Sequence, residues 1–115
     1  MAVAGKDVGR AEWESTLEEL TTQHEGDYVT IEVLDLSLGD QLEVERLPFR
    51  YAAYDRRADT VVIAVGGTTG RYPVVLRHMV AQPVTLTIDA AADPPSALIT
   101  DADGTSTLIS FYRGD

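Results

Sequence analysis

The sequence predicts an α+β domain with one N-terminal helix packed on a mostly antiparallel sheet of six to seven short strands, strongly bent or rolled into a small open barrel. The prediction rests on a change of period. Apolar residues recur with helical spacing near the N-terminus, and from Tyr28 onward they alternate with polar residues. The length suits one hydrophobic core, and no linker or repeat divides the chain. We therefore expect a single domain over residues 1–115.

The helix is predicted over residues 9–24. Trp13, Leu17 and Leu20 recur at i, i+4 and i+7 and form an apolar stripe, while acidic residues fill the first turn at the positive end of the helix dipole. We therefore expect Trp13 to anchor the core rather than to stack on a ligand. His24 ends the segment, where its ring suits the negative end of the dipole.

The strands are predicted from alternation and from the turn residues between them. Gly39 and Gly104 can adopt the positive φ of tight turns, and Pro48 has no amide hydrogen for a strand partner, so it marks an edge or a strand end. The segment 60–65 is apolar on both faces, which indicates the most buried strand. The expected strands lie near residues 29–33, 41–45, 49–54, 60–65 and 83–89, followed by a terminal hairpin over 97–112.

Residues 76–83 read LRHMVAQP and carry one of the two histidines. Prolines on both sides of this stretch favour a crossover between two strands. Two hypotheses for His78 follow. In the first, its ring bonds a backbone carbonyl or a carboxylate and fixes a corner outside any strand. In the second, Arg71, Arg77 and His78 surround a pocket under the helix and bind a small molecule or an anion.

The net charge of −10 is unevenly distributed. Residues 1–45 have a net charge of −10, residues 46–77 carry six arginines against two aspartates, and residues 78–115 have a net charge of −4. An acidic surface repels phosphate backbones, so no nucleic-acid partner is expected. We expect the central arginines to pair with acids on neighbouring strands; the alternative is a patch that binds an anion or an acidic partner.

Composition excludes several other classes. The chain has no cysteine, which rules out disulfides and cysteine-based zinc sites. The first residues lack the basic-then-apolar pattern of a secretory signal, and no apolar run approaches the roughly 18 residues of a membrane span. We expect a cytoplasmic protein without a membrane partner.

Three short motifs suggest sites and fail on spacing. The segment GGTTGR at 66–71 lacks the lysine and following Ser/Thr of a phosphate-binding loop. The segment DADG at 101–104 begins like a calcium loop, but Tyr112 stands where the twelfth-position glutamate belongs. Asp55 and Asp59 are better explained as a solvated turn than as paired catalytic carboxylates. No catalytic residue, metal ligand or cofactor is predicted.

A spaced set of residues extends along most of the chain. It comprises Trp13, IEV at 31–33, LGDQ at 38–41, Leu47-Pro48, YDRRAD at 54–59, RHMVAQP at 77–83 and LITDADG at 98–104. The set resembles the small bacterial proteins of domain of unknown function family 5335, from about Trp13 to Ile109. Arg56 and Arg57 replace the proline and lysine expected in that family, and the loop GGTTGR is longer. The resemblance implies a helix with a sheet and assigns no activity.

The leading functional hypothesis is a non-enzymatic domain that binds a protein partner or another copy of itself. Strand edges offer backbone groups for pairing, and no set of residues assembles into catalytic machinery. The alternative is a small-molecule or anion-binding domain, or a weak enzyme, with its pocket around Arg77 and His78.

Overall fold

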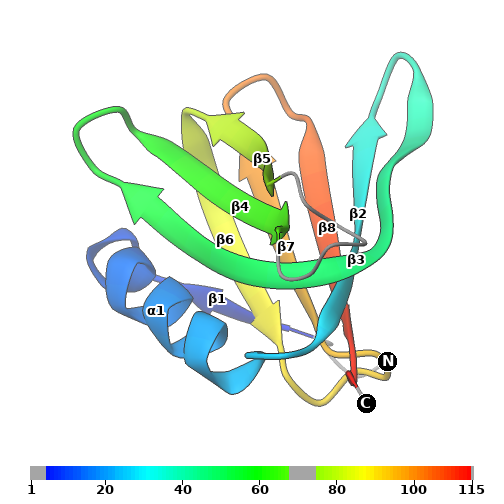
Figure 1. Cartoon of the computed structure of the whole chain (residues 1–115). Helices are drawn as coiled ribbons and strands as arrows, with labels where there is room; N and C mark the ends of the chain where they lie inside the picture. The colour runs from blue at the N-terminus through cyan, green and yellow to red at the C-terminus, as the bar shows by residue number, and fades with distance from the viewer. Residues whose placement is uncertain (1–4, 68–74, 115) are drawn as a thin grey trace.

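The computed structural model describes residues 5–67 and 75–114, which form one α-helix, one short 3-10 helix and eight strands. All strand pairs are antiparallel, in the order β1-β6-β7-β8-β2-β3-β4-β5 (Figure 1). The elements are β1 (Lys6–Val8), η1 (Arg10–Glu12), α1 (Trp13–Gln23), β2 (Tyr28–Asp35), β3 (Gly39–Asp55), β4 (Thr60–Gly66), β5 (Val75–Ala81), β6 (Pro83–Asp89), β7 (Ser96–Asp101) and β8 (Ser106–Tyr112).

The α+β class with one helix and an antiparallel open sheet is confirmed, but the predicted count of six to seven strands is wrong. Two strands were not expected: β1 is only three residues long, too short for its alternation to be recognised, and β5 occupies the predicted crossover. Conversely, the predicted strands at 41–45 and 49–54 are one strand of 17 residues, β3.

The stretch 76–83 is therefore mostly strand. His78 lies opposite Ile63 of β4 in regular antiparallel register. The corner lies at its end, where Gln82 alone separates β5 from β6 and adopts a φ of 53°. The Gln82 amide donates to the carbonyl of Asp59, which holds the corner against the β3–β4 turn. Pro83 begins the next strand, β6, and Pro73 lies outside the described residues.

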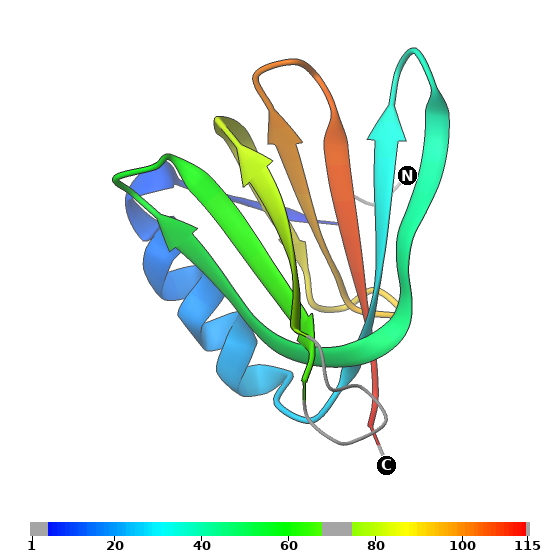
Figure 2. The same cartoon turned by 45° about the horizontal axis from the view of Figure 1, so that its top comes forward.

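The long strand β3 changes its partner midway. Its first half pairs with β2 as far as Pro48, and its second half pairs with β4 from Phe49 onward. Irregular register opposite Thr30 and a φ of 52° at Arg46 bend the strand just before the change. Figure 2 shows β3 curving between two arms of the fold, β2 with β6, β7 and β8 on one side and β4 with β5 on the other. Pro48 marks this change of partner, not the end of a strand.

Beyond Pro48 the edge that β3 presented to β2 has no strand partner among the described elements. Helix α1 packs along it instead (Figures 1 and 2). The Thr21 hydroxyl accepts a hydrogen bond from the Ala52 amide and lies within bonding distance of the Ala52 carbonyl, both at 3.0 Å. One threonine thus takes the place that a neighbouring strand would occupy, because buried backbone groups need partners.

The apolar stripe of α1 completes the core between the two arms. Trp13, Leu17 and Leu20 are 1%, 0% and 4% exposed, which confirms the predicted helix and its buried face. They pack with residues from both arms: Val29, Ile31, Phe49, Ala52, Val61, Ile63, Leu86, Ala97, Ile99, Ile109 and Phe111.

The predicted turn chemistry is also confirmed. Gly39 and Gly104 have φ values of 80° and 86°. The Asp101 carboxylate accepts hydrogen bonds from the amides of Asp103 and Thr105, and Asp55 closes the β3–β4 turn in the same way. Both carboxylates therefore stabilise their own turns.

Replacing Thr21 by valine keeps the side-chain shape and removes the hydroxyl. We expect the free energy of unfolding to fall by about 1–3 kcal/mol, because the Ala52 amide loses its acceptor and the hydroxyl hydrogen between the Leu17 and Ala52 carbonyls is removed. Urea denaturation followed by circular dichroism measures the change.

Thr22→Val is the matched control, since the exposed Thr22 hydroxyl bonds only to the helix carbonyl of Glu18 among the described residues. It should change stability by no more than about 0.5 kcal/mol. Equal losses in the two variants would contradict the role given to Thr21.

Candidate functional site

Arg77 and His78 are neighbours in β5, so their side chains point to opposite faces of the sheet. His78 lies opposite Ile63, which is fully buried, and therefore points into the space between the arms. Arg77 lies opposite Ala64 and points outward. The structure does not bring the two side chains to one pocket. The third predicted ligand residue, Arg71, lies outside the described residues.

The Arg77 side chain forms part of a cross-strand arrangement on the outer side of β3, β4 and β5. Its Nε donates to the Tyr51 hydroxyl at 3.2 Å, and both residues are register partners of Ala64. Ala64 has no exposed surface although its side chain points outward, because the tyrosine and the arginine meet over it.

His78 is half-buried and faces the inner side of the opposite arm. Burial lowers its pKa below the ordinary 6.5, and the carboxylate of Glu43 opposes this shift more weakly. No hydrogen bond from another described side chain contributes to the shift. The sequence suggested that His78 bonds a carbonyl or a carboxylate at a corner outside any strand. Burial, and not such a hydrogen bond, is the main cause of its pKa shift.

A cavity of about 600 Å³ lies elsewhere, between β1, α1 and the end of β6. Val8, Leu20 and Ile88 contribute apolar surface. Its charged lining consists of Lys6 with four acids, Asp7, Glu12, Glu19 and Asp89. This acidic lining does not suit the anion that the sequence suggested for an arginine-lined pocket.

In the part of the chain that the structure describes, the central arginines form no ion pair with an acid on a neighbouring strand. Among described residues, Arg56 alone of this group pairs with an acid, Glu14, at 3.8 Å. Arg50 donates to the Gly67 carbonyl, and Arg46 stacks on the Tyr112 ring at 3.7 Å. For Arg50 and Arg77 the reason is the register, because both lie on strands that pair with β4 and β4 carries no acidic residue. The charges remain on the surface, which favours the alternative of a binding patch.

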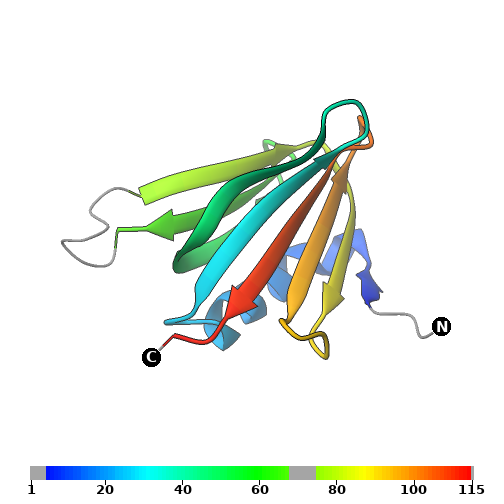
Figure 3. The same ribbon diagram turned by 90° about the vertical axis from the view of Figure 1, so that its right-hand side faces the viewer.

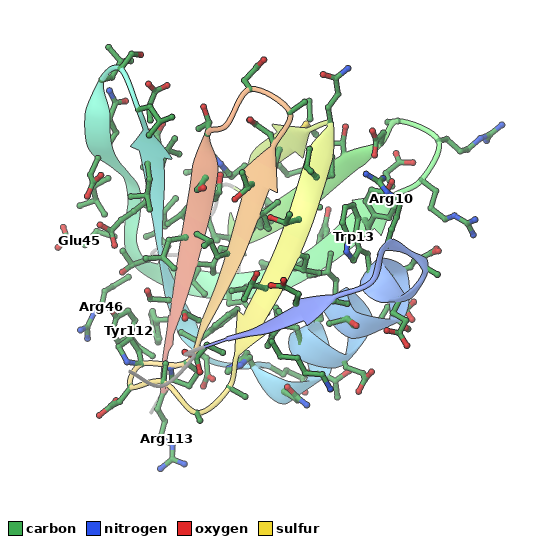
Figure 4. The ribbon with its side chains drawn as sticks, turned by 180° about the vertical axis from the view of Figure 1, so that it is seen from behind. Arg10, Trp13, Glu45, Arg46, Tyr112 and Arg113 are labelled. Carbon is green, nitrogen blue, oxygen red and sulfur yellow. The ribbon has the colours of Figure 1, made fainter. Side chains whose placement is uncertain are left out.

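A further arginine, outside that group, organises a polar cluster at the N-terminal end of α1. The Arg10 guanidinium donates to the Tyr54 hydroxyl (3.1 Å), to Asp59 (3.2 Å) and to the Pro83 carbonyl (2.9 Å). It also lies over the Trp13 ring at 4.3 Å, beside the labelled tryptophan in Figure 4. These contacts join η1 to the β3–β4 turn and to the β5–β6 corner.

Hydrogen bonding in this cluster favours a neutral Tyr54 hydroxyl and a charged Asp59 carboxylate. The Tyr54 hydroxyl donates to Asp59 at 2.7 Å, which raises the pKa of Tyr54 and lowers the pKa of Asp59. Trp13, Tyr54, Asp59 and Pro83 all belong to the spaced set of the sequence, so the residues of that set meet around Arg10. Sequence reasoning missed Arg10 because nothing in its neighbourhood signals a long-range partner.

Sequence reasoning also missed an apolar surface on the outer side of β2, β3, β7 and β8. Leu42 lies opposite Glu32, Glu32 opposite Leu108, and Leu108 opposite Leu98, so these leucines share one face. The leucine surface comprises Leu34, Leu36, Leu38 and Leu42 of the β2–β3 hairpin with Leu98 and Leu108. Its most exposed members are Leu36 at 92%, Leu38 at 70% and Leu42 at 55%.

The leucine surface continues to the end of the molecule. Figure 3 shows the tip of the β2–β3 hairpin beside the turn between β7 and β8. A Cβ placed on Gly104 of that turn would lie 3.9 Å from Leu36 Cδ1. Two acids share this side, Glu32 opposite Leu42 and Asp40 opposite Leu34, and no residue from 32 to 45 is basic. Figure 4 shows the molecule from behind, with Glu45, Arg46 and Tyr112 labelled down the left side of the view.

The family model described as "Family of unknown function (DUF5335)" matches residues 4–114, nearly the whole chain. The chain belongs to this family. No curated protein and no solved structure matches it significantly. The family resemblance of the sequence is thereby confirmed, and it assigns no activity to this member of DUF5335.

Two further features of this DUF5335 chain concern its histidines and its helix. His24 ends α1 as predicted, with Nδ1 2.9 Å from Asp27 Oδ2 and its ring stacked on Phe111. His24 lies on a different element from His78.

In the parts of the chain described, no three metal-ligating side chains gather, and no helix is long and apolar enough to cross a membrane.

The lowered pKa of His78 predicts a pH dependence of stability. The folded state resists protonation of this ring more than the unfolded chain does. Its contribution is therefore fully present above pH 6.5 and is lost as the pH falls towards the lower folded pKa. In His78→Gln, the free energy of unfolding should decrease less between about pH 7.5 and about pH 5 than in the unmodified protein.

Urea denaturation at both pH values measures this difference. Other groups titrate equally in the two proteins, so the comparison isolates His78. An equal or larger decrease in His78→Gln would show that the ring is protonated as readily in the folded protein as in the unfolded chain.

Proposed function

We propose that this protein is a protein-binding domain whose contact surface is the leucine surface. The supporting observation is the exposure of Leu36, Leu38 and Leu42 on one projecting hairpin, next to the half-buried Leu98 and Leu108. Contiguous apolar patches on a folded surface mark binding sites, whereas scattered exposed leucines do not.

Burial of these side chains favours association. Transferring one exposed leucine into an apolar contact contributes about 1.5–3 kcal/mol before the entropic cost of association is subtracted. Their exposure also means that they contribute little to the core, whose buried residues come from the other face of the same strands. The leucines at the hairpin tip are thus available for a partner without cost to folding.

The alternative of an anion or small-molecule site around Arg77 and His78 has weaker support. Adjacent strand residues face opposite sides, and the acid-lined cavity between β1, α1 and β6 contains neither residue. Arg77 on its own offers one guanidinium on an open sheet face rather than a concave site.

Site-specific photo-crosslinking in cells that naturally produce the chain tests the proposal. A photoreactive residue at position 37, between Leu36 and Leu38, should form discrete crosslinks to a protein. Mass spectrometry then identifies this protein, and the complex is reconstituted from purified components. Changing both leucines to serine should abolish the crosslinks and leave the free energy of unfolding within about 0.5 kcal/mol.

The matched control is a photoreactive residue at Val84, which is 52% exposed on β6 and lies outside the leucine surface. Crosslinks that are equal from positions 37 and 84, or that persist without the two leucines, would contradict the proposal.

A further inference from the structure

The outer side of β3, β4 and β5 presents a second open surface. Its register rows are Ala53–Val62–Met79 and Tyr51–Ala64–Arg77. We call the outward side chains of these rows the arginine face. Met79 is 60% exposed, and the other members apart from Ala64 are half-buried or exposed. No described element packs on this side of the strands (Figure 1).

Positive charge surrounds this apolar row. Arg77 lies in the row beside Ala53–Val62–Met79, Arg50 lies at the end near Gly67, and Arg57 lies in the turn at the other end. None of the three forms an ion pair with a described acid. A partner with apolar side chains bordered by acidic ones would match this surface.

The leucine surface has that composition. It offers leucines at the hairpin tip, and the register places the acids Glu32 and Asp40 on the same side, opposite Leu42 and Leu34. The two surfaces lie on the outer sides of opposite arms (Figure 2), so a molecule cannot dock its own hairpin on its own arginine face. A second copy can accept it.

We infer that the leucine surface of one copy docks on the arginine face of another. This inference rests on the proposed function and names the partner as the same chain. After the first contact one copy retains a free arginine face and the other a free leucine surface, so the association is head-to-tail. Such an interface continues into a ring or a filament rather than closing as a symmetric dimer.

The decisive experiment uses two blocked variants of the full chain. In one, Leu36→Ser and Leu38→Ser disable the leucine surface; in the other, Arg77→Glu and Met79→Glu disable the arginine face. Analytical ultracentrifugation should find unmodified protein growing in mass with concentration and each blocked variant monomeric. An equimolar mixture should form a 1:1 dimer and nothing larger, since one intact surface of each kind remains.

Two control variants carry matched changes outside both surfaces: Val84→Ser for the leucines and Arg113→Glu for the charge reversal. Both should associate like the unmodified protein. Raising the salt concentration from about 50 mM to about 500 mM should weaken the association at least about tenfold, because the paired charges are screened.

A symmetric hairpin-to-hairpin dimer predicts that the Arg77→Glu, Met79→Glu variant dimerises on its own and that the mixture contains no 1:1 complex of the two variants. That result overturns the inference. So does an unmodified protein that stays monomeric up to about 0.5 mM. In that case, crosslinks from position 37 to a different protein would leave the proposed function standing. The absence of such crosslinks would remove both.

Discussion

The change of partner in β3 is the constraint on which the remaining structure depends. One strand of 17 residues belongs to two arms, and its bend at Arg46 turns the second half away from β2. That turn leaves backbone groups without a strand partner at an edge that must be buried. Helix α1 covers the edge through Thr21, and its apolar stripe fills the space between the arms. The helix is thus required by the bend rather than added to a finished sheet.

The sequence predicts those parts of the fold that depend on local period. The stripe of Trp13, Leu17 and Leu20 identifies the helix, and turn residues such as Gly104 identify hairpins. It does not predict β5, because an edge strand flanked by prolines resembles a crossover. It does not predict the role of Thr21 either, since a threonine beside the stripe carries no sign of its long-range partner.

Prediction of the candidate surfaces from the sequence also fails where it depends on how distant segments pair. Arg77 and His78 look like a pair in the sequence, but once they lie in a strand they face opposite sides. The leucine surface did leave a signal: Leu34, Leu36 and Leu38 alternate out of phase with the buried residues of β2. An out-of-phase apolar series is expected where both faces of a hairpin are used, one for the core and one for a partner.

Native-state hydrogen exchange at the Ala52 amide tests most directly whether α1 replaces a strand partner at the bent strand. If Thr21 holds this amide as a neighbouring strand would, it should exchange as slowly as the amides at the centre of β4 and open only with global unfolding. Exchange of the Ala52 amide at the rate of an exposed loop, with β4 still protected, would contradict the account.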